Sequence, residues 1–143
     1  MAVINNVMAL DVGSVRIGVA VSSLGAKIPR PLTTLINSNN IFDEINNLVI
    51  SQDVQVIVVG LPRGMDGQIT EQTKQTQNFV KKLQSNVKLP IYTQDEALTS
   101  HKAKEELDSR GKPYAKEDID ALAATYILDD FILDNAKKLE QEL

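Results

Sequence analysis

Short runs of apolar residues near the start of the chain alternate with polar breaks and predict a pair of strands. Residues 7–10 form an apolar run that Asp11 and Gly13 interrupt, and residues 17–21 form a second run rich in β-branched side chains. Runs of this kind, bounded by glycine and polar residues, are typical of strands joined by a short turn. The pattern therefore predicts a β-hairpin.

A third strand and a first helix follow the hairpin. Residues 27–36 suit an extended segment, but Pro29 and Pro31 exclude a central place in a sheet because proline cannot donate to a strand ladder. Residues 41–49 then place apolar side chains at helical spacing, with polar cap residues at 38–40 in front of them. We therefore expect an irregularly entered strand and then an amphipathic helix.

The second half of the chain alternates strand and helix patterns. Residues 54–59 are mostly β-branched without polar alternation, which is typical of a central strand covered on both faces. The further elements expected are a helix over 69–83 that ends near Asn86, a short strand at 91–93, a helix over 99–110 stopped by Gly111, and a last helix from 116 to beyond Phe131. This order predicts an α/β fold: a five-stranded mixed sheet of three antiparallel strands followed by βαβ crossovers, flanked by helices.

Composition narrows the chemistry that the chain can perform. Its 143 residues predict a single domain over residues 1–143, in which about 134–143 form a charged helical tail. With no cysteine and one histidine, the sequence excludes disulfides, thiolate zinc sites and thiol catalysis, and it disfavours a histidine-rich metal site. Any bound metal is therefore expected to have oxygen ligands.

The charge balance bears on the partners of the chain. Fifteen Lys and Arg residues against nineteen Asp and Glu residues give a net charge of −4 and a pI near 5.0. This is the wrong sign for coating nucleic acid by bulk attraction, so nucleic-acid binding needs a local basic site or metal ions. The first ten residues lack a basic start, and no apolar run is long enough to span a membrane. We expect a cytoplasmic protein with no membrane partner.

Acidic residues stand at the ends of two predicted strands. Asp11 follows the first strand, where α/β sheets place ligands, although aspartate there is also ordinary turn chemistry. Asp95 and Glu96 follow the short strand at 91–93 and could simply form a solvated pair. Because neighbouring side chains of an extended segment point to opposite faces, at most one of these two acids can face a given site.

The last predicted helix offers a third carboxylate. Asp120 lies on one helical stripe with the apolar residues Ala124, Ile127 and Phe131, whereas Asp118 lies on a more mixed stripe. Acidic residues in a first helical turn are also favoured by the helix dipole alone. We therefore expect Asp120 to be the inward-facing acid.

Carboxylates from separate elements that meet at one sheet edge need a counter-charge, because otherwise they repel and raise one another's pKa. Hard divalent cations such as Mg²⁺ and Mn²⁺ prefer oxygen ligands. Two such ions about 4 Å apart stabilise both the attacking and the leaving oxygen of a phosphoryl displacement. The acids therefore favour an Mg²⁺ or Mn²⁺ site, provided that they converge.

Four sequence blocks resemble one known family. They are D-V-G-S-V-R-I-G-V-A at 11–20, V-V-G-L-P-R-G-M-D-G at 58–67, D-E-A-L-T-S at 95–100 and D-I-D-A-L-A-A at 118–124. In this order and spacing they are similar to the YqgF/RuvX family, nucleases of the ribonuclease H-like superfamily. The resemblance covers nearly the whole chain and implies a ribonuclease H-like fold with the strand order expected above.

The resemblance also implies a site and a substrate. By position, the catalytic and metal-binding carboxylates would be Asp11, Glu96 and Asp120, with Mg²⁺ or Mn²⁺ as cofactor. Some members resemble processors of the 5′ side of the small-subunit ribosomal RNA precursor, and others are described as Holliday junction resolvases. The implied partner is therefore precursor ribosomal RNA or branched DNA.

Two positions depart from the family pattern. Val15 stands where a basic residue is usual, and Ala97 stands where an arginine usually follows the D-E pair. Alanine cannot replace the bidentate phosphate contact of an arginine. These departures affect the expected binding of substrate more than the expected binding of metal.

Several residues near the motifs are candidates for substrate binding. They are Gly13, which lets a backbone come close, and the basic residues Arg16, Arg63, Lys102 and Lys104. Arg63 belongs to a glycine-rich loop at 60–67, which is either an ordinary turn or a substrate-facing loop whose arginine contacts phosphate. His101 is expected to be a surface residue, since two-metal hydrolysis can proceed without it.

Together these features predict a metal-dependent phosphodiesterase that acts on structured nucleic acid. The preferred substrate is the 5′ end of pre-16S ribosomal RNA, and a four-way DNA junction is the alternative. A non-catalytic RNA-binding assembly factor stays open because of the acidic charge and Ala97. An ATPase or kinase of the actin type also has D-x-G before a hairpin, but that architecture needs two such domains. Symmetric junction cleavage calls for a homodimer, so we expect a monomer or a homodimer.

Overall fold

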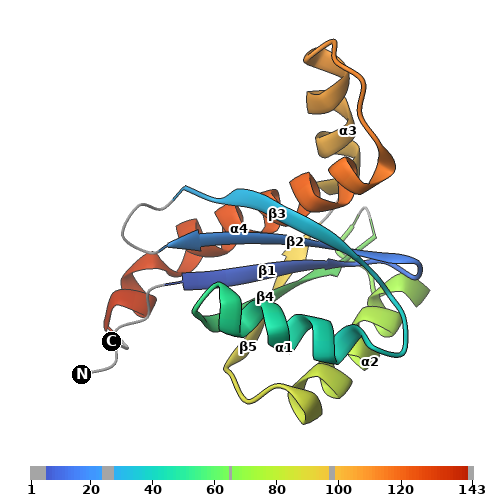
Figure 1. Ribbon diagram of the computed structural model, residues 1–143. Coiled ribbons are helices and arrows are strands. Elements are labelled where there is room, and N and C mark those ends of the chain that lie inside the picture. The colour runs from blue at the N-terminus through green and yellow to red at the C-terminus, as the bar shows by residue number, and fades with distance from the viewer. Residues whose placement is uncertain (1–5, 24–27, 65, 97–98, 142–143) are drawn as a thin grey trace.

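The computed structural model arranges five strands in one mixed sheet with the order β3-β2-β1-β4-β5 (Figure 1). The elements along the chain are β1 (Asn6–Val12), β2 (Arg16–Ser23), β3 (Arg30–Ile36), α1 (Ile41–Ser51), β4 (Val54–Pro62), α2 (Glu71–Asn86), β5 (Ile91–Glu96), α3 (Thr99–Ser109) and α4 (Lys116–Gln141). The structure describes residues 6–23, 28–64, 66–96 and 99–141, and the side chains of these except at 99–102 and 136–141. Strands β1, β2 and β3 pair antiparallel, while β4 pairs parallel with both β1 and β5. The predicted sheet is confirmed.

The strands extend further than the apolar runs that predicted them. Asp11 pairs with Gly18 inside the β1–β2 ladder, and Glu96 pairs with Pro62 inside the β4–β5 ladder. The expectation that the strands end at Leu10 and Thr93, before these acids, is therefore wrong by two and three residues. Backbone hydrogen bonds make the ladder, so it continues through polar side chains as long as a neighbouring strand is present.

Helices cover both faces of the sheet, and the alternation of buried residues along β1 shows which face each helix covers. Met8 and Leu10 pack with residues of α1 and α2, whereas Val7 and Ala9 pack with residues of α4. In Figure 1, α1 and α2 lie in front of the sheet and α4 lies behind it. Strand β4 is buried on both faces, as its β-branched run predicts.

Strand β3 is an edge strand, and its proline is accommodated there. Pro31 lies opposite Ala20, at a point where the register between β2 and β3 shifts. An edge position leaves one side of the strand without a partner, so the missing N–H of proline costs little. The predicted exclusion of this segment from the centre of the sheet is confirmed.

Helix α1 begins at Ile41 as predicted, whereas helix α2 begins later than predicted. Helix α1 begins after Asn40, whose side chain makes no capping hydrogen bond. Helix α2 begins at Glu71 rather than at Ile69, because Thr70 and Thr73 form a reciprocal capping box that fixes the first turn. Ile69 thus lies outside the helix and is 59% exposed, instead of belonging to its apolar stripe.

Helix α3 packs on α4 rather than on the sheet. Ala103 and Leu107 form a small apolar cluster with Leu122 and Ala123. Figure 1 shows α3 projecting beyond the sheet from this contact. In the part of the chain that the structure describes, no helix is long and apolar enough to cross a membrane.

Candidate active site

Asp11 lies on the face of the sheet that α4 covers, next to a residue without a side chain. Its partner in the ladder is Gly18 of β2. A Cβ atom added at Gly18 would lie only 1.9 Å from the backbone oxygen of Asp120 and 2.8 Å from the backbone nitrogen of Ala121. The first turns of α4 can therefore rest directly on β2, which brings Asp120 to the strand that neighbours Asp11.

The surroundings of Asp11 disfavour its charged form. The pKa of Asp11 is raised from 3.8 to about 7, first because the carboxyl is desolvated by burial and second because the carboxylate of Asp120 is near. An anion in such a place is disfavoured unless a positive charge compensates it. The pair consequently has the electrostatic character of a cation site or of a proton-holding acid.

Arg16 supplies a compensating positive charge for Asp120. Its Nε atom lies 2.6 Å from Oδ2 of Asp120, and the two side chains are 27% and 20% exposed. We expected Arg16 to contact substrate phosphate, whereas the structure shows its guanidinium bound to a candidate catalytic acid. The contact joins residues of β2 and α4, and spacing along the sequence could not have revealed it.

The turn between β1 and β2 sets the position of both Asp11 and Arg16. The backbone N–H of Gly13 donates to the carbonyl of Arg16 at 2.9 Å, and a Cβ atom at Gly13 would lie 2.7 Å from that same oxygen. The side chain of Asn37 donates to the Gly13 carbonyl at 2.9 Å. Gly13, a candidate for substrate contact, therefore also closes the turn tightly.

Strand register separates the roles of Asp95 and Glu96. Leu10 of β1 pairs with Val59 of β4, and Gly60 pairs with Gln94 of β5, so Gln94 shares the α4 face with Asp11. Consistently, Gln94 donates to Asp134 of α4 at 2.8 Å. Glu96 is two residues further along the same strand and therefore faces the same side, with its Oε1 atom shielded from solvent.

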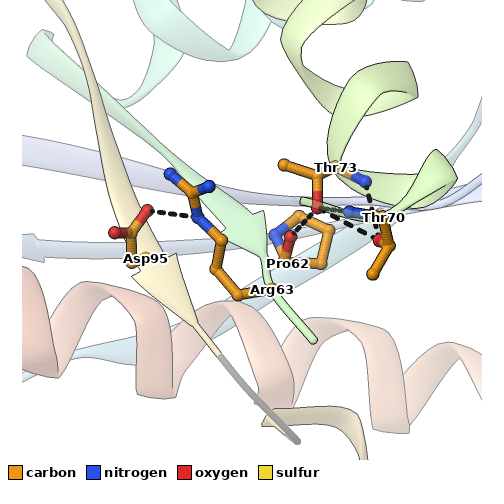
Figure 2. Close-up of polar contacts among 5 residues, drawn as sticks. All are labelled: Pro62, Arg63, Thr70, Thr73 and Asp95. Carbon is orange, nitrogen blue, oxygen red and sulfur yellow. Dashed lines mark hydrogen bonds and ion pairs between the residues drawn. The ribbon is translucent and has the colours of Figure 1, made fainter. Parts of the chain in front are cut away.

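Asp95 faces away from that side and is engaged elsewhere. Its side chain is 66% exposed and accepts a hydrogen bond of 3.1 Å from Nε of Arg63 (Figure 2). The backbone N–H of Arg63 also donates to the carbonyl of Glu96 at 2.9 Å. The expectation from strand alternation, that only one of Asp95 and Glu96 can face the site, agrees with this geometry, and the residue on the Asp11 face is Glu96.

The glycine-rich loop after β4 is anchored at its base. Figure 2 shows the hydroxyl of Thr73 donating to the carbonyl of Pro62, beside the Thr70–Thr73 capping box. Gly64 donates to the carbonyl of Gln68 at 2.8 Å. The T-x-x-T spacing is a capping signal that sequence reasoning could have used to find this anchor.

The structure brings some of the predicted site residues together and leaves others apart. Asp11, Asp120 and Arg16 form one cluster, and Glu96 shares their face two strands from β1. Among the residues with described side chains, no three Asp, Glu or His side chains are arranged to hold a metal ion. Lys104 is exposed on α3. Ala97 and the side chains of His101 and Lys102 lie outside the described residues.

Comparison with known proteins gives the family. The family model described as "RuvX: Holliday junction resolvase" matches residues 5–134. The chain belongs to the RuvX family. A relative from Sulfurihydrogenibium sp. (strain YO3AOP1), named "Putative pre-16S rRNA nuclease", is 35% identical over 130 residues, which cover 90% of each chain. A relative of the same name from Thermoanaerobacter pseudethanolicus is 38% identical over 131 residues, which cover 88% of this chain and 94% of the relative.

Solved structures of Thermus thermophilus RuvC share the fold of this RuvX-family chain. One superposes with a TM-score of 0.55 at 17% identity, covering 92% of this chain and 96% of RuvC. Another, RuvC in complex with a Holliday junction substrate, gives a TM-score of 0.53 at 19% identity, with 90% and 95% coverage. The predicted ribonuclease H-like fold is confirmed, and the predicted membership of the YqgF/RuvX family is confirmed by the family match.

Proposed function

We propose that this RuvX-family protein is a nuclease that hydrolyses phosphodiester bonds of structured nucleic acid with the help of Mg²⁺ or Mn²⁺, and that its substrate is the 5′ end of pre-16S ribosomal RNA. One observation carries the proposal: Asp120, distant in sequence, has its backbone against Gly18, the ladder partner of Asp11, and burial together with the nearby Asp120 raises the pKa of Asp11. The names of the relatives support the RNA substrate. Such a precursor would be processed in the cytoplasm, where we place the protein.

The donor set fits a hard divalent cation. Asp11 and Asp120 supply carboxylate oxygens, and burial of Asp11 makes a compensating positive charge favourable. Glu96 lies on the same face of the sheet and is the third proposed ligand. When bound, a divalent cation supplies the charge that lowers the pKa of the attacking water and stabilises the departing 3′ oxygen, so that the products carry 5′-phosphate and 3′-hydroxyl ends.

The remaining residues of the site hold these acids and the substrate. Arg16 orients Asp120 through their ion pair, and the same guanidinium is within reach of a phosphate that approaches Asp120. Arg63 is fixed at its backbone by Glu96, and its guanidinium pairs with the exposed Asp95. A phosphate could therefore replace Asp95 at Arg63 at low cost, because exposed ion pairs contribute little. Lys102 and Lys104 are the further proposed phosphate contacts.

A four-way DNA junction is the second candidate substrate. The family description names Holliday junction resolvase, and one RuvC structure with the same fold holds a junction. A resolvase must place two active sites symmetrically, which requires a dimer. The two substrates therefore differ in the oligomeric state that they need.

A parallel cleavage assay tests the proposal. Pre-16S RNA with its 5′ extension and a four-way DNA junction are incubated with the protein in Mg²⁺, in Mn²⁺ and in chelator. We expect cleavage of the RNA that depends on divalent cations and is lost in Asp11→Asn, with circular dichroism showing that the variant is folded. Failure to cleave either substrate, or full activity of Asp11→Asn, would refute the proposed nuclease.

A further inference from the structure

A groove opens on the opposite face of the sheet from the Asp11–Asp120 pair. It has a volume of about 730 Å³ and lies between the turn that follows β1, the segment that leads from β3 into α1, and α2. Figure 1 shows these three segments at the same end of the sheet. The volume falls within the range of about 300–1,000 Å³ that is typical of small-ligand sites.

The lining of the groove suits a neutral, planar, polar-edged ligand. Side-chain amides line both walls, from Asn37 and Asn39 on one side and from Gln72, Gln75 and Asn78 on the other. Amides donate and accept hydrogen bonds at once, as the edges of nucleobases do. The charged lining residues Glu71 and Lys82 have opposite signs, so the groove offers little net attraction to a phosphate.

An apolar surface lies beneath the amides. Phe42 and Phe79 line the groove and contact each other, with ring centroids 5.4 Å apart. Phe79 is 8% exposed, and the side chain of Thr76 beside it is 1% exposed. Unpaired bases are bound in proteins by apolar or aromatic contacts to the ring together with polar contacts at the ring edge.

The groove is connected to the candidate active site by the residues that follow Asp11 in the sequence. Val12, Gly13 and Ser14 line it and directly follow Asp11. Two of the large exposed apolar side chains lie next to lining residues in the sequence: Val15 and Ile36 are each 60% exposed.

We propose that this amide-lined groove binds an unpaired nucleobase of the substrate strand beside the bond held at Asp11. The inference rests on the proposed nuclease function and extends it, because it makes a single-stranded nucleotide next to the cleavage position part of what the protein recognises. A nucleobase is also present in a free nucleotide, so the test separates a strand from a mononucleotide.

The test reads binding in chelator, where no cleavage occurs. The side-chain amide resonances of the protein are followed by NMR during titration with adenosine 5′-monophosphate, ribose 5-phosphate, a single-stranded RNA hexamer and the same hexamer with one abasic position. We expect the hexamer and the mononucleotide to shift the amides of Gln75 and Asn78, the hexamer to bind more tightly than the mononucleotide, and ribose 5-phosphate to leave these amides unchanged.

The double variant Gln75→Ala/Asn78→Ala removes two amides from exposed positions of α2, where alanine favours the helix. We expect it to bind the hexamer about tenfold more weakly, the loss typical of one base contact. Gln84→Ala is the matched control, because Gln84 is an exposed amide on α2 outside the lining. We expect its affinity to equal that of the unchanged protein.

Four results would overturn the inference. They are equal hexamer affinity of the double variant and the control, equal shifts with ribose 5-phosphate, mononucleotide binding as tight as that of the hexamer, and shifts caused by protein concentration alone, which would assign the groove to a second copy of the chain. These results are independent of the nuclease proposal. A protein that binds the hexamer as expected but cleaves nothing would refute the nuclease proposal and support nucleobase binding in the groove. Cleavage together with any of the four results would support the nuclease and refute nucleobase binding in the groove.

Discussion

The guanidinium of Arg16 and the carboxylate of Asp120 form an ion pair of 2.6 Å between β2 and α4, on the face of the sheet that carries Asp11. The pair gives Asp120 a positive neighbour while Asp11 has Asp120 as a negative one. The two candidate acids therefore differ in their electrostatic surroundings, although they lie together. This asymmetry underlies several of the predictions below.

Asp11→Asn is expected to change stability as well as activity. A raised carboxyl pKa means that the folded state favours the protonated acid, so its contribution to stability is fully present below about pH 3.8 and is lost as the pH rises through about 7. The ionised carboxyl then destabilises the fold at pH 8. Each unit of pKa shift corresponds to about 1.4 kcal/mol, and partial solvent screening reduces the effect, so we expect the variant to be about 1–3 kcal/mol more stable at pH 8.

Urea unfolding at pH 5 and pH 8 measures this difference. The gain in the free energy of unfolding of Asp11→Asn should be smaller at pH 5, where Asp11 of the unchanged protein is largely protonated in the folded state. A gain of equal size at both values would show that burial of the charge is not the cause. Asp66→Asn, at an exposed position, serves as the control and should change stability at neither value.

Glu96 and Asp95 provide a test within one dipeptide. We expect Glu96→Gln to lower the cleavage rate at least about 100-fold, as loss of a charged group that acts in the transition state does. Asp95→Asn should change the rate less than about threefold, because Asp95 faces away and its ion pair with Arg63 is exposed. Single-turnover cleavage of the RNA substrate measures both. The reverse ranking would contradict the assignment of Glu96 to the site.

Arg16→Ala removes the positive neighbour of Asp120. We expect a lower free energy of unfolding, because Asp11 and Asp120 then lie near each other without the guanidinium. We also expect Mn²⁺ to raise the melting temperature of this variant more than that of the unchanged protein, since the cation no longer competes with Arg16.

Thermal unfolding with and without Mn²⁺ checks this prediction. Arg30→Ala is the matched control, because Arg30 is exposed and donates to Gln52 at 3.2 Å, away from the acids. Its response to Mn²⁺ should equal that of the unchanged protein. An Arg16→Ala response no larger than the control would mean that Arg16 does not compete with the cation.

Gly18→Ala should disrupt the junction between β2 and α4. The new Cβ would overlap the backbone of Asp120, which has no free rotamer to move aside, so we expect destabilisation by more than about 3 kcal/mol and loss of activity. Thr34→Ala is a milder change at the position of β3 that pairs with Gly18, because it removes only the 2.7 Å hydrogen bond to the Glu117 carbonyl of α4 and should cost about 1 kcal/mol. A stable and active Gly18→Ala protein would contradict the close approach.

Much of the fold could be predicted from local pattern. The apolar runs gave the order of the strands and helices, and the prolines before the third strand indicated an edge position that β3 occupies. The ends of elements were less predictable. Asp11 and Glu96 lie within strands because backbone pairing continues past the apolar runs, and α2 starts later than its apolar pattern because Thr70 caps it.

The candidate site could likewise be predicted only in part. Strand alternation alone showed that Asp95 and Glu96 face opposite sides, and helical spacing alone singled out Asp120 over Asp118. Neither pattern could show that Arg16 binds Asp120, since that contact depends on how closely α4 approaches β2. The convergence of the amides that line the groove could not be predicted from the sequence, because they come from separate segments of the chain.

By itself, the sequence determined the periodicity of each element and therefore which side chains share a face, because both follow from backbone geometry within a few residues. Only the tertiary structure decided which faces meet and at what distance. The absence of a side chain at Gly18 lets α4 pack directly against β2. This contact places Asp120 beside Arg16 and near Asp11, and it thereby contributes to the raised pKa of Asp11.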